Sequence, residues 1–492
     1  MTSPSESASQ PIRMPSSAEP TSGSPALPHS WLPAAVAGAF FLVFCLLVLN
    51  QSEKLIEPDA YAYRASIEAL KNGQISLNQT QYDALSLQLQ QSSLGGGIMQ
   101  WHRNDDGSWV SEKNPGYPFL AVPFDAIGAR RLAPLFYGLL ACLGMWFGGR
   151  RWLGRWGGTF AIGVYCATPL AMVMAWRSTM PSFTDASLIA AGLGLLIWSI
   201  VAIERGATHR RLVGALAFFT FSTATFVRYT NVVVVLVAAV IAVAVIARPR
   251  WGLSPTTLFW WFAATLPPFA AVLIYNTKVF DGPFSTGYRA STIQFTVGAI
   301  PENLRIMPRS LLQAMPVVIL ALAALIGLLA SQIMAVRRQQ GSTEPRARDR
   351  VVGSLLVLTW ISLWGLYSAY EWTATFTTGP GNLRPGAGPS VAMSGTQTVY
   401  STVRFYLPAL GAIALLAAWL LTRIPPMVSI TVLVGLFAIG GREYIATTTS
   451  RWAGQPSVGG PSRPEMQPPD RPSSPPPAGA LSRRFEIPAQ SP

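Results

Sequence analysis

The residues best suited to chemistry lie in one polar segment, residues 51–118, between the first apolar run and all the others. It opens with Glu57 and Asp59, two carboxylates separated by one proline, and it closes with Lys113 just before the chain turns apolar again. Paired carboxylates can divide proton transfer from substrate positioning. A lysine ammonium is a point charge that suits a phosphate. One interpretation of the segment is therefore a site where Asp59 is a general base or a metal-binding carboxylate, supported by Glu57, and where Lys113 contacts a phosphate.

Both ends of the segment also have structural interpretations. Asp59 begins a predicted amphipathic helix over 59–70, and aspartate is favoured as a helix N-cap. Lys113 precedes a Pro-Gly-Tyr turn and would equally serve as an interfacial anchor. Residues 72–111 are rich in Gln, Ser and Gly and are predicted to form a solvated connector with a hairpin turn at 105–107. The predicted helix is expected to lie in the membrane interface.

Composition places the chain among membrane proteins. It is 50% hydrophobic and 12% charged over 492 residues, whereas soluble domains carry about 25% charged residues. The net charge of +14 sits largely in short connectors between apolar runs. This distribution is typical of membrane topology, so nucleic acid is not an expected partner.

The predicted fold is an all-α polytopic membrane protein with about eleven transmembrane helices and a large first extracytoplasmic loop that carries the interfacial helix. The predicted spans are 31–49, 132–149, 157–175, 183–203, 212–227, 230–247, 256–275, 311–335, 351–370, 405–422 and 426–441. Basic residues in alternate loops predict a cytoplasmic N-terminus in the plasma (inner) membrane and an extracytoplasmic active site.

Three domains are expected along the chain. Residues 1–30 are predicted to be a disordered cytoplasmic tail, and residues 446–492 a disordered Pro-rich tail. Between them, residues 31–445 form the transmembrane domain, which includes the extracytoplasmic loop 50–131.

Several further side chains are predicted near the outer face. Arg228, Arg289 and Arg404 would stabilise a phosphate, because a guanidinium fork matches phosphate oxygens. Helix ends at the interface are the alternative for Arg228 and Arg404. The tyrosines Tyr61, Tyr117 and Tyr288 would line a sugar site or serve as interface tyrosines.

No metal site is predicted from the cysteines and histidines. Cys45, Cys142 and Cys166 lie within apolar runs, and the three histidines are scattered. No cofactor is certain, although a divalent cation could bridge a carboxylate and a phosphate.

The order of these pieces resembles the GT-C superfamily of membrane glycosyltransferases, near the protein mannosyltransferase and aminoarabinose transferase-like group (family 39-like). That family has an acidic, Tyr-containing motif after the first helix and a Lys-x-Pro-x-Tyr-like segment before the second. The corresponding pieces here are 57–63, 113–118, 227–231, 276–288 and 404–408. Two departures stand out: Pro58 separates the two acidic residues, and Lys113 is followed by Asn-Pro-Gly where close relatives have consecutive prolines.

The resemblance implies an inverting transfer of a sugar from a polyprenyl-phosphate carrier to an extracytoplasmic acceptor, which would be an envelope glycan, lipid or protein. It implies that Asp59 is a general base or an acceptor-positioning carboxylate and that Lys113 contacts the carrier phosphate. The alternatives are a transporter or flippase for lipid-linked sugars and a polysaccharide polymerase or ligase. A non-catalytic envelope scaffold is a further alternative.

Overall fold

The computed structural model describes residues 31–53, 58–92, 98, 100–201, 207–247, 254–287, 295–337, 344–371 and 395–449. The chain divides into a unit of residues 1–450 and a second of residues 451–492. The second unit and residues 1–30, where disordered tails are predicted, lie outside the described residues.

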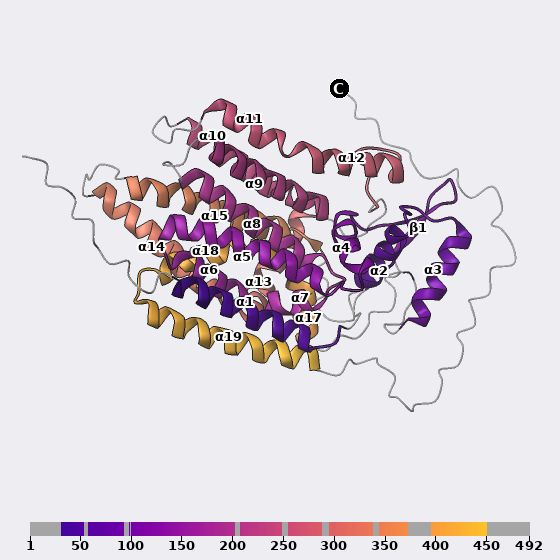
Figure 1. The fold of residues 1–492 in the computed structure, drawn as a ribbon, viewed down its shortest axis with the longest axis horizontal. Helices are drawn as coiled ribbons and strands as arrows, with labels where there is room; N and C mark the ends of the chain where they lie inside the picture. Colours follow the sequence, from indigo (N-terminus) through magenta and orange to yellow (C-terminus); the bar gives the residue numbers. More distant parts are fainter. Residues whose placement is uncertain are drawn as a thin grey trace, which may run out of the picture. The chain divides into compact units, whose positions relative to one another are not determined.

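The described part is almost entirely helical (Figure 1). Its first half contains α1 (Leu32–Asn50), α2 (Pro58–Lys71), α3 (Gln79–Gln91), β1 (Trp101–Arg103), β2 (Trp109–Ser111), α4 (Gly116–Ala126), α5 (Leu132–Leu153), α6 (Gly157–Cys166), α7 (Pro169–Trp176), α8 (Ser182–Val201), α9 (Ala207–Val227), η1 (Tyr229–Asn231) and α10 (Val232–Ile246). Its second half contains α11 (Pro255–Ala263), α12 (Leu266–Phe280), η3 (Val297–Ala299), α13 (Ile300–Ala314), α14 (Val318–Arg337), α15 (Glu344–Ser368), α17 (Gly395–Val403), η5 (Arg404–Ala409), α18 (Leu410–Leu421) and α19 (Pro426–Thr449).

These helices make the chain an all-α, multi-pass membrane protein, as its apolar blocks predict. Among the described residues, eight helices are long and apolar enough to cross a membrane, or up to ten if each of two bent pairs counts as one span. The predicted count of eleven is not confirmed. The predicted span 157–175 is two helices bent by 63° where Pro169 begins α7. Helix α19 also continues to Thr449, beyond the predicted domain end at residue 445.

Helices α5 and α8 form the centre of the bundle, and glycine lets their backbones touch. A Cβ added to Gly148 would lie 2.3 Å from the carbonyl oxygen of Gly194, and one added to Gly194 would lie 2.1 Å from that of Gly144. Small residues at such contacts are the usual means of close helix packing in membranes. The tight pairing holds α8 against α5, and the first turn of α8 carries Asp185.

One end of the bundle carries α2, α3, the β-hairpin and α4; we call it the loop face (Figure 1). The connector predicted over 72–111 is largely folded here, which corrects that expectation. Asn78 caps α3 with a complete capping box, and β1 pairs antiparallel with β2 around the predicted turn. A hydrophobic cluster of Ala62, Ala65, Ala69, Leu77, Leu85, Leu89 and Trp101 joins these pieces to α2.

The predicted helix over 59–70 is present as α2, but its surroundings differ from the expected membrane interface. Protein covers it on nearly all sides, and even Arg64 and Ser66 are buried. Four alanines along α2 allow α3 and α4 to approach it closely. Burial from both sides holds the first turn of α2, and with it Asp59, in one place.

Candidate functional site

The centre of the candidate site is the carboxylate of Asp59, in the first turn of α2. Its Oδ1 lies 3.0 Å from Lys113 Nζ, and its Oδ2 lies 2.7 Å from Arg404 Nη2. Arg404 is 345 residues away in the sequence. The carboxylate therefore joins three distant segments, and each of its oxygens faces a cation.

Lys113 lies in the short turn between β2 and α4. Its backbone N–H donates to Ser111 Oγ at 3.2 Å. Gly116 follows, and a Cβ at that position would lie 2.4 Å from the carbonyl of Phe226 in α9. Only glycine permits so close an approach. The turn that presents Lys113 is thus fixed between the hairpin and the end of α9.

Arg404 begins η5 and is held by two neighbours. Its Nη1 donates to the carbonyl of Ser401 at 2.9 Å, and its guanidinium lies 4.7 Å from the ring centroid of Phe405. Arg228 uses the same ring, at 5.1 Å. Cations over aromatic faces are attracted by the ring quadrupole. Phe405 therefore connects two of the predicted phosphate-binding arginines.

Arg228 itself is paired with Asp185 rather than with Asp59. Its Nε lies 3.6 Å from Asp185 Oδ2, and its Nη2 donates to Ser182 Oγ at 3.0 Å. Asn231 also donates to Asp185. The predicted spans 212–227 and 230–247 are separate helices in the structure, with Arg228 extended between α9 and η1.

The two cations set the charge state of Asp59. Burial alone would raise the pKa of Asp59, but Lys113 and Arg404 outweigh it and, with a hydrogen bond from Gln100, hold that pKa well below its usual range. Asp59 is thus ionised at neutral pH. The ammonium of Lys113 and the guanidinium of Arg404 are also groups that can bind phosphate oxygens.

Gln100 is a site residue that sequence reasoning missed. Its side chain hydrogen-bonds Asp59, and its backbone has a φ of 54°, in the left-handed region. Its Oε1 is buried and has no hydrogen-bond partner within the described part of the chain. A strained backbone of this kind costs about 1–3 kcal/mol and clusters at functional sites. Glutamine has no preference for the left-handed conformation, so nothing in the sequence indicated that Gln100 belongs to the site.

Arg177 is a second missed residue. It follows α7, is 2% exposed, and its Nη1 donates to Ser401 Oγ at 3.3 Å. Ser401 therefore links Arg177 to Arg404. A sequence signal existed in this case, because Arg177 interrupts a long apolar stretch and charges within such stretches are often functional.

The remaining predicted residues are placed less centrally or not at all. Tyr117 is fully buried, and its hydroxyl donates to the carbonyl of Ser178, so it packs the core beneath the site. Tyr61 is half-buried on α2. Glu57, Tyr288 and Arg289 lie outside the described residues.

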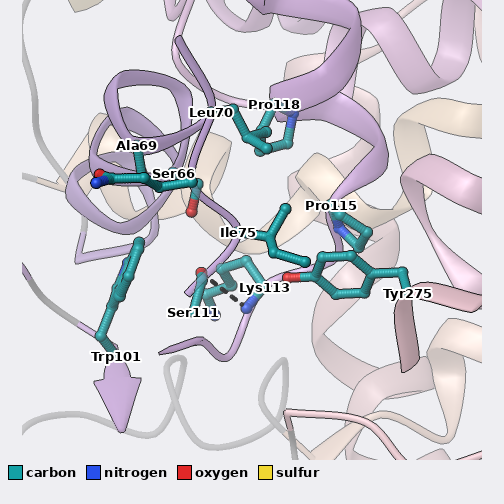
Figure 2. Close-up of a pocket in the computed structure, with 11 residues that line it drawn as sticks. Ser66, Ala69, Leu70, Ile75, Trp101, Ser111, Lys113, Pro115, Pro118 and Tyr275 are labelled. Carbon is teal, nitrogen blue, oxygen red and sulfur yellow. Dashed lines mark hydrogen bonds between the residues drawn. The ribbon is translucent and has the colours of Figure 1, made fainter. Parts of the chain in front are cut away.

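A small cavity opens beside Lys113, between α2, the hairpin and α12 (Figure 2). Its volume is about 20 Å³, which is room for roughly one water molecule. Its lining residues include Ser66, Ser111, Lys113, Trp101 and Tyr275. Figure 2 shows Ser111 and Lys113 joined by their hydrogen bond at its edge. The cavity can admit a single hydroxyl beside Lys113, not a whole sugar ring.

Metal ligands are not gathered at this site. Within the described ranges, no group of three His, Cys, Asp or Glu side chains is positioned to hold a metal ion.

No protein-family profile matches the chain, and no curated protein is similar to it. Two solved structures are similar. The first is ArnT from Cupriavidus metallidurans bound to undecaprenyl phosphate, with 15% identity and a TM-score of 0.45, covering 81% of this chain and 61% of that one. The second is the Archaeoglobus fulgidus oligosaccharyltransferase in the apo form, with 11% identity and a TM-score of 0.46, covering 87% of this chain and 57% of that one. This chain thus spans about three fifths of the length of each. Similarity at this level carries no activity from one chain to another, so function must be argued from the side chains.

Proposed function

We propose that this chain is a membrane glycosyltransferase that moves a sugar from a polyprenyl-phosphate carrier to an acceptor on the loop face. The observation that carries the proposal is the carboxylate of Asp59 held 3.0 Å from Lys113 and 2.7 Å from Arg404 at one end of an apolar bundle. The resemblance to the GT-C superfamily implies that Asp59 is the base or the acceptor-positioning carboxylate and that Lys113 contacts the phosphate.

The cluster suits the charge change in such a transfer. The acceptor oxygen attacks the anomeric carbon, and the bond from that carbon to the phosphate oxygen breaks with its electron pair on the phosphate. Lys113 and Arg404 are placed to stabilise the growing negative charge, as fixed cations do in buried sites. A single displacement of this kind inverts the anomeric centre.

The acceptor proton needs a base, and the low pKa of Asp59 makes it a weak one while both cations face it. A carrier phosphate that draws Lys113 or Arg404 toward itself would raise the pKa of Asp59. Donor binding would in this way strengthen the base. Until then, Asp59 positions the acceptor hydroxyl by accepting a hydrogen bond.

The test uses purified full-length protein in lipid nanodiscs with radiolabelled polyprenyl-phosphate sugars and an envelope fraction as acceptor. Asp59→Asn should abolish transfer, because the amide neither accepts the proton nor balances two cations. Asp106→Asn, in the exposed hairpin turn where Asp106 only accepts from Ser108, is the matched control and should keep full activity. Full transfer by Asp59→Asn overturns the proposal.

A second measurement separates donor binding from chemistry. Lys113→Gln and Arg404→Gln should each weaken binding of a short-chain polyprenyl phosphate by about tenfold or more, since a hydrogen bond to a charged group is worth roughly 1.5–3 kcal/mol. Unchanged binding by both variants would place the phosphate elsewhere. Movement of the donor across reconstituted vesicles without any transfer would favour the transporter alternative.

A further inference from the structure

Helix α13 has an unusual position for a helix next to a membrane span. The segments Val297–Ala314 and Val318–Met334 meet the criteria for a membrane span only together, and they are bent by 107°. All the charged residues of the pair lie in Val297–Ala314, and Val318–Met334 has none. If Val318–Met334 is the part that spans the bilayer, Val297–Ala314 runs roughly parallel to the membrane surface. The side chain of Asn303 ties it to the end of α15 by donating to the carbonyls of Ser368 at 2.7 Å and Tyr370 at 3.0 Å.

The surface of α13 is divided into strips along its length. One strip packs against the protein and contains Asn303, Met307, Leu311 and Ala314. The next strip is exposed and apolar, with Leu304 60% and Leu312 43% exposed and Pro308 exposed between them. These residues recur at i, i+4 and i+8, so they share one side of the helix.

The apolar strip is bordered by cations. Arg305 and Arg309, again four residues apart, follow the apolar strip around the helix, and both are exposed. Arg305 is 2.8 Å from Glu302, whereas Arg309 has no ion pair within the described part of the chain. Glu302 and Gln313 complete the polar side. Apolar, basic and polar strips in this order are typical of a helix lying in a membrane interface.

The apolar strip also continues into the membrane-facing side of the next helix. Ile319 and Leu322 of α14 are 59% and 45% exposed, as expected for side chains that face lipid. Leu304 and Leu312 therefore extend a lipid-facing surface around the bend onto α13. A protein partner is not needed to cover them.

We infer that α13 lies in the membrane interface on the loop face, with Leu304, Pro308 and Leu312 in the acyl region and Arg305 and Arg309 bound to anionic lipid headgroups. The ligand of Arg305 and Arg309 is an anionic phospholipid, because its phosphate oxygens can accept hydrogen bonds from the two guanidinium groups. This assignment is independent of the proposed sugar transfer, since none of these residues contacts Asp59.

The inference is tested with full-length protein in vesicles of phosphatidylcholine, with or without phosphatidylglycerol. A nitroxide on Leu304→Cys should be more accessible to oxygen than to a water-soluble nickel complex, and a nitroxide on Gln313→Cys should show the reverse. Unmodified protein, whose cysteines are buried or half-buried, gives the labelling background. Equal exposure of both labels to the nickel complex, or no access of either reagent to Leu304→Cys, overturns the interfacial position.

The headgroup assignment has its own readout. Spin-labelled phosphatidylglycerol should contact a fluorophore on Leu304→Cys in preference to spin-labelled phosphatidylcholine. Each of Arg305→Gln and Arg309→Gln should lower that preference by about fivefold, since one basic residue at a surface contributes about that factor. Arg103→Gln in the hairpin is the matched control and should leave it unchanged. A preference that survives removal of both arginines refutes the headgroup assignment.

Discussion

The ion pair between Asp59 and Arg404 can be measured with a double-mutant cycle. At an effective dielectric constant of about 20, two unit charges 2.7 Å apart attract by roughly 6 kcal/mol. Part of this is offset because the Arg404 side chain is only 4% exposed and has lost its hydration. Coupling energies of close interfacial charge pairs range from about 1.5 to 7 kcal/mol. We therefore expect a coupling of about 3 kcal/mol.

The cycle consists of Asp59→Asn, Arg404→Gln and the double variant. Asp59→Asn should be strongly destabilising, because two buried cations lose the carboxylate that they share. The double variant should be less unstable than the two single losses added together, because it removes one of those two cations as well. The free energy of unfolding is obtained by titrating mixed micelles with denaturing detergent.

The cycle also has a clear negative outcome. A coupling below about 0.5 kcal/mol would mean that the two side chains do not interact in the folded protein, since distant sites add to within about that amount. The site would then lose its central contact, and the low pKa of Asp59 would lose one of its causes. The pair of Lys113→Gln with Asp59→Asn gives a parallel cycle across the 3.0 Å contact.

Three further predictions follow from the same geometry. The pKa of Asp59 is depressed in the folded state, so its stabilisation should be fully present above the unfolded pKa of about 3.9 and be lost as the pH falls through the lower folded value. The difference in unfolding free energy between wild type and Asp59→Asn should therefore be constant from pH 7 to 5 and shrink below about pH 4. A difference that shrinks near neutral pH would contradict this. Asp185→Asn should cost about 1–3 kcal/mol, because the carboxylate is the common partner of Arg228 and of the buried amide of Asn231; a loss under 0.5 kcal/mol in the detergent titration would contradict these contacts. Gln100→Gly should be about 1 kcal/mol more stable than Gln100→Ala, because both lose the bond to Asp59 but only glycine relieves the positive φ; equal stabilities would mean that the backbone is unstrained.

The parts of the fold that apolar patterning controls were predictable. The first span, the helix after Pro58 and the break at Arg228 all follow from runs of apolar residues and from their interruption. Asp59 and Lys113 could be selected chiefly because the motifs around them resemble those of a known family, and Arg404 because it adjoins an apolar run on the same predicted side. Their mutual distances could not, because contacts across hundreds of residues depend on how the helices pack.

Other features had no local sequence signal. The predicted span 311–335 begins only near the end of α13, because Pro301, Pro308 and three charged residues interrupt the apolar pattern before it. Proline is tolerated in the first turn of a helix, where Pro301 lies. The folded region over 72–111 depends on packing against α2 rather than on its own weak periodicity. For Tyr117 the sequence suggested a ligand contact that the structure does not have, since its side chain packs in the core.

The arrangement of charges explains why three segments meet at this end of the bundle. A lone arginine within an apolar region costs about 2.5–3.5 kcal/mol on insertion scales, and Arg404 and Arg228 would each incur part of this cost. Asp59 offsets it for Arg404, Asp185 offsets it for Arg228, and the Phe405 ring lies against both guanidinium groups. Lys113 adds a second cation to Asp59 at 3.0 Å, so the same carboxylate brings α2, the turn before α4 and η5 together.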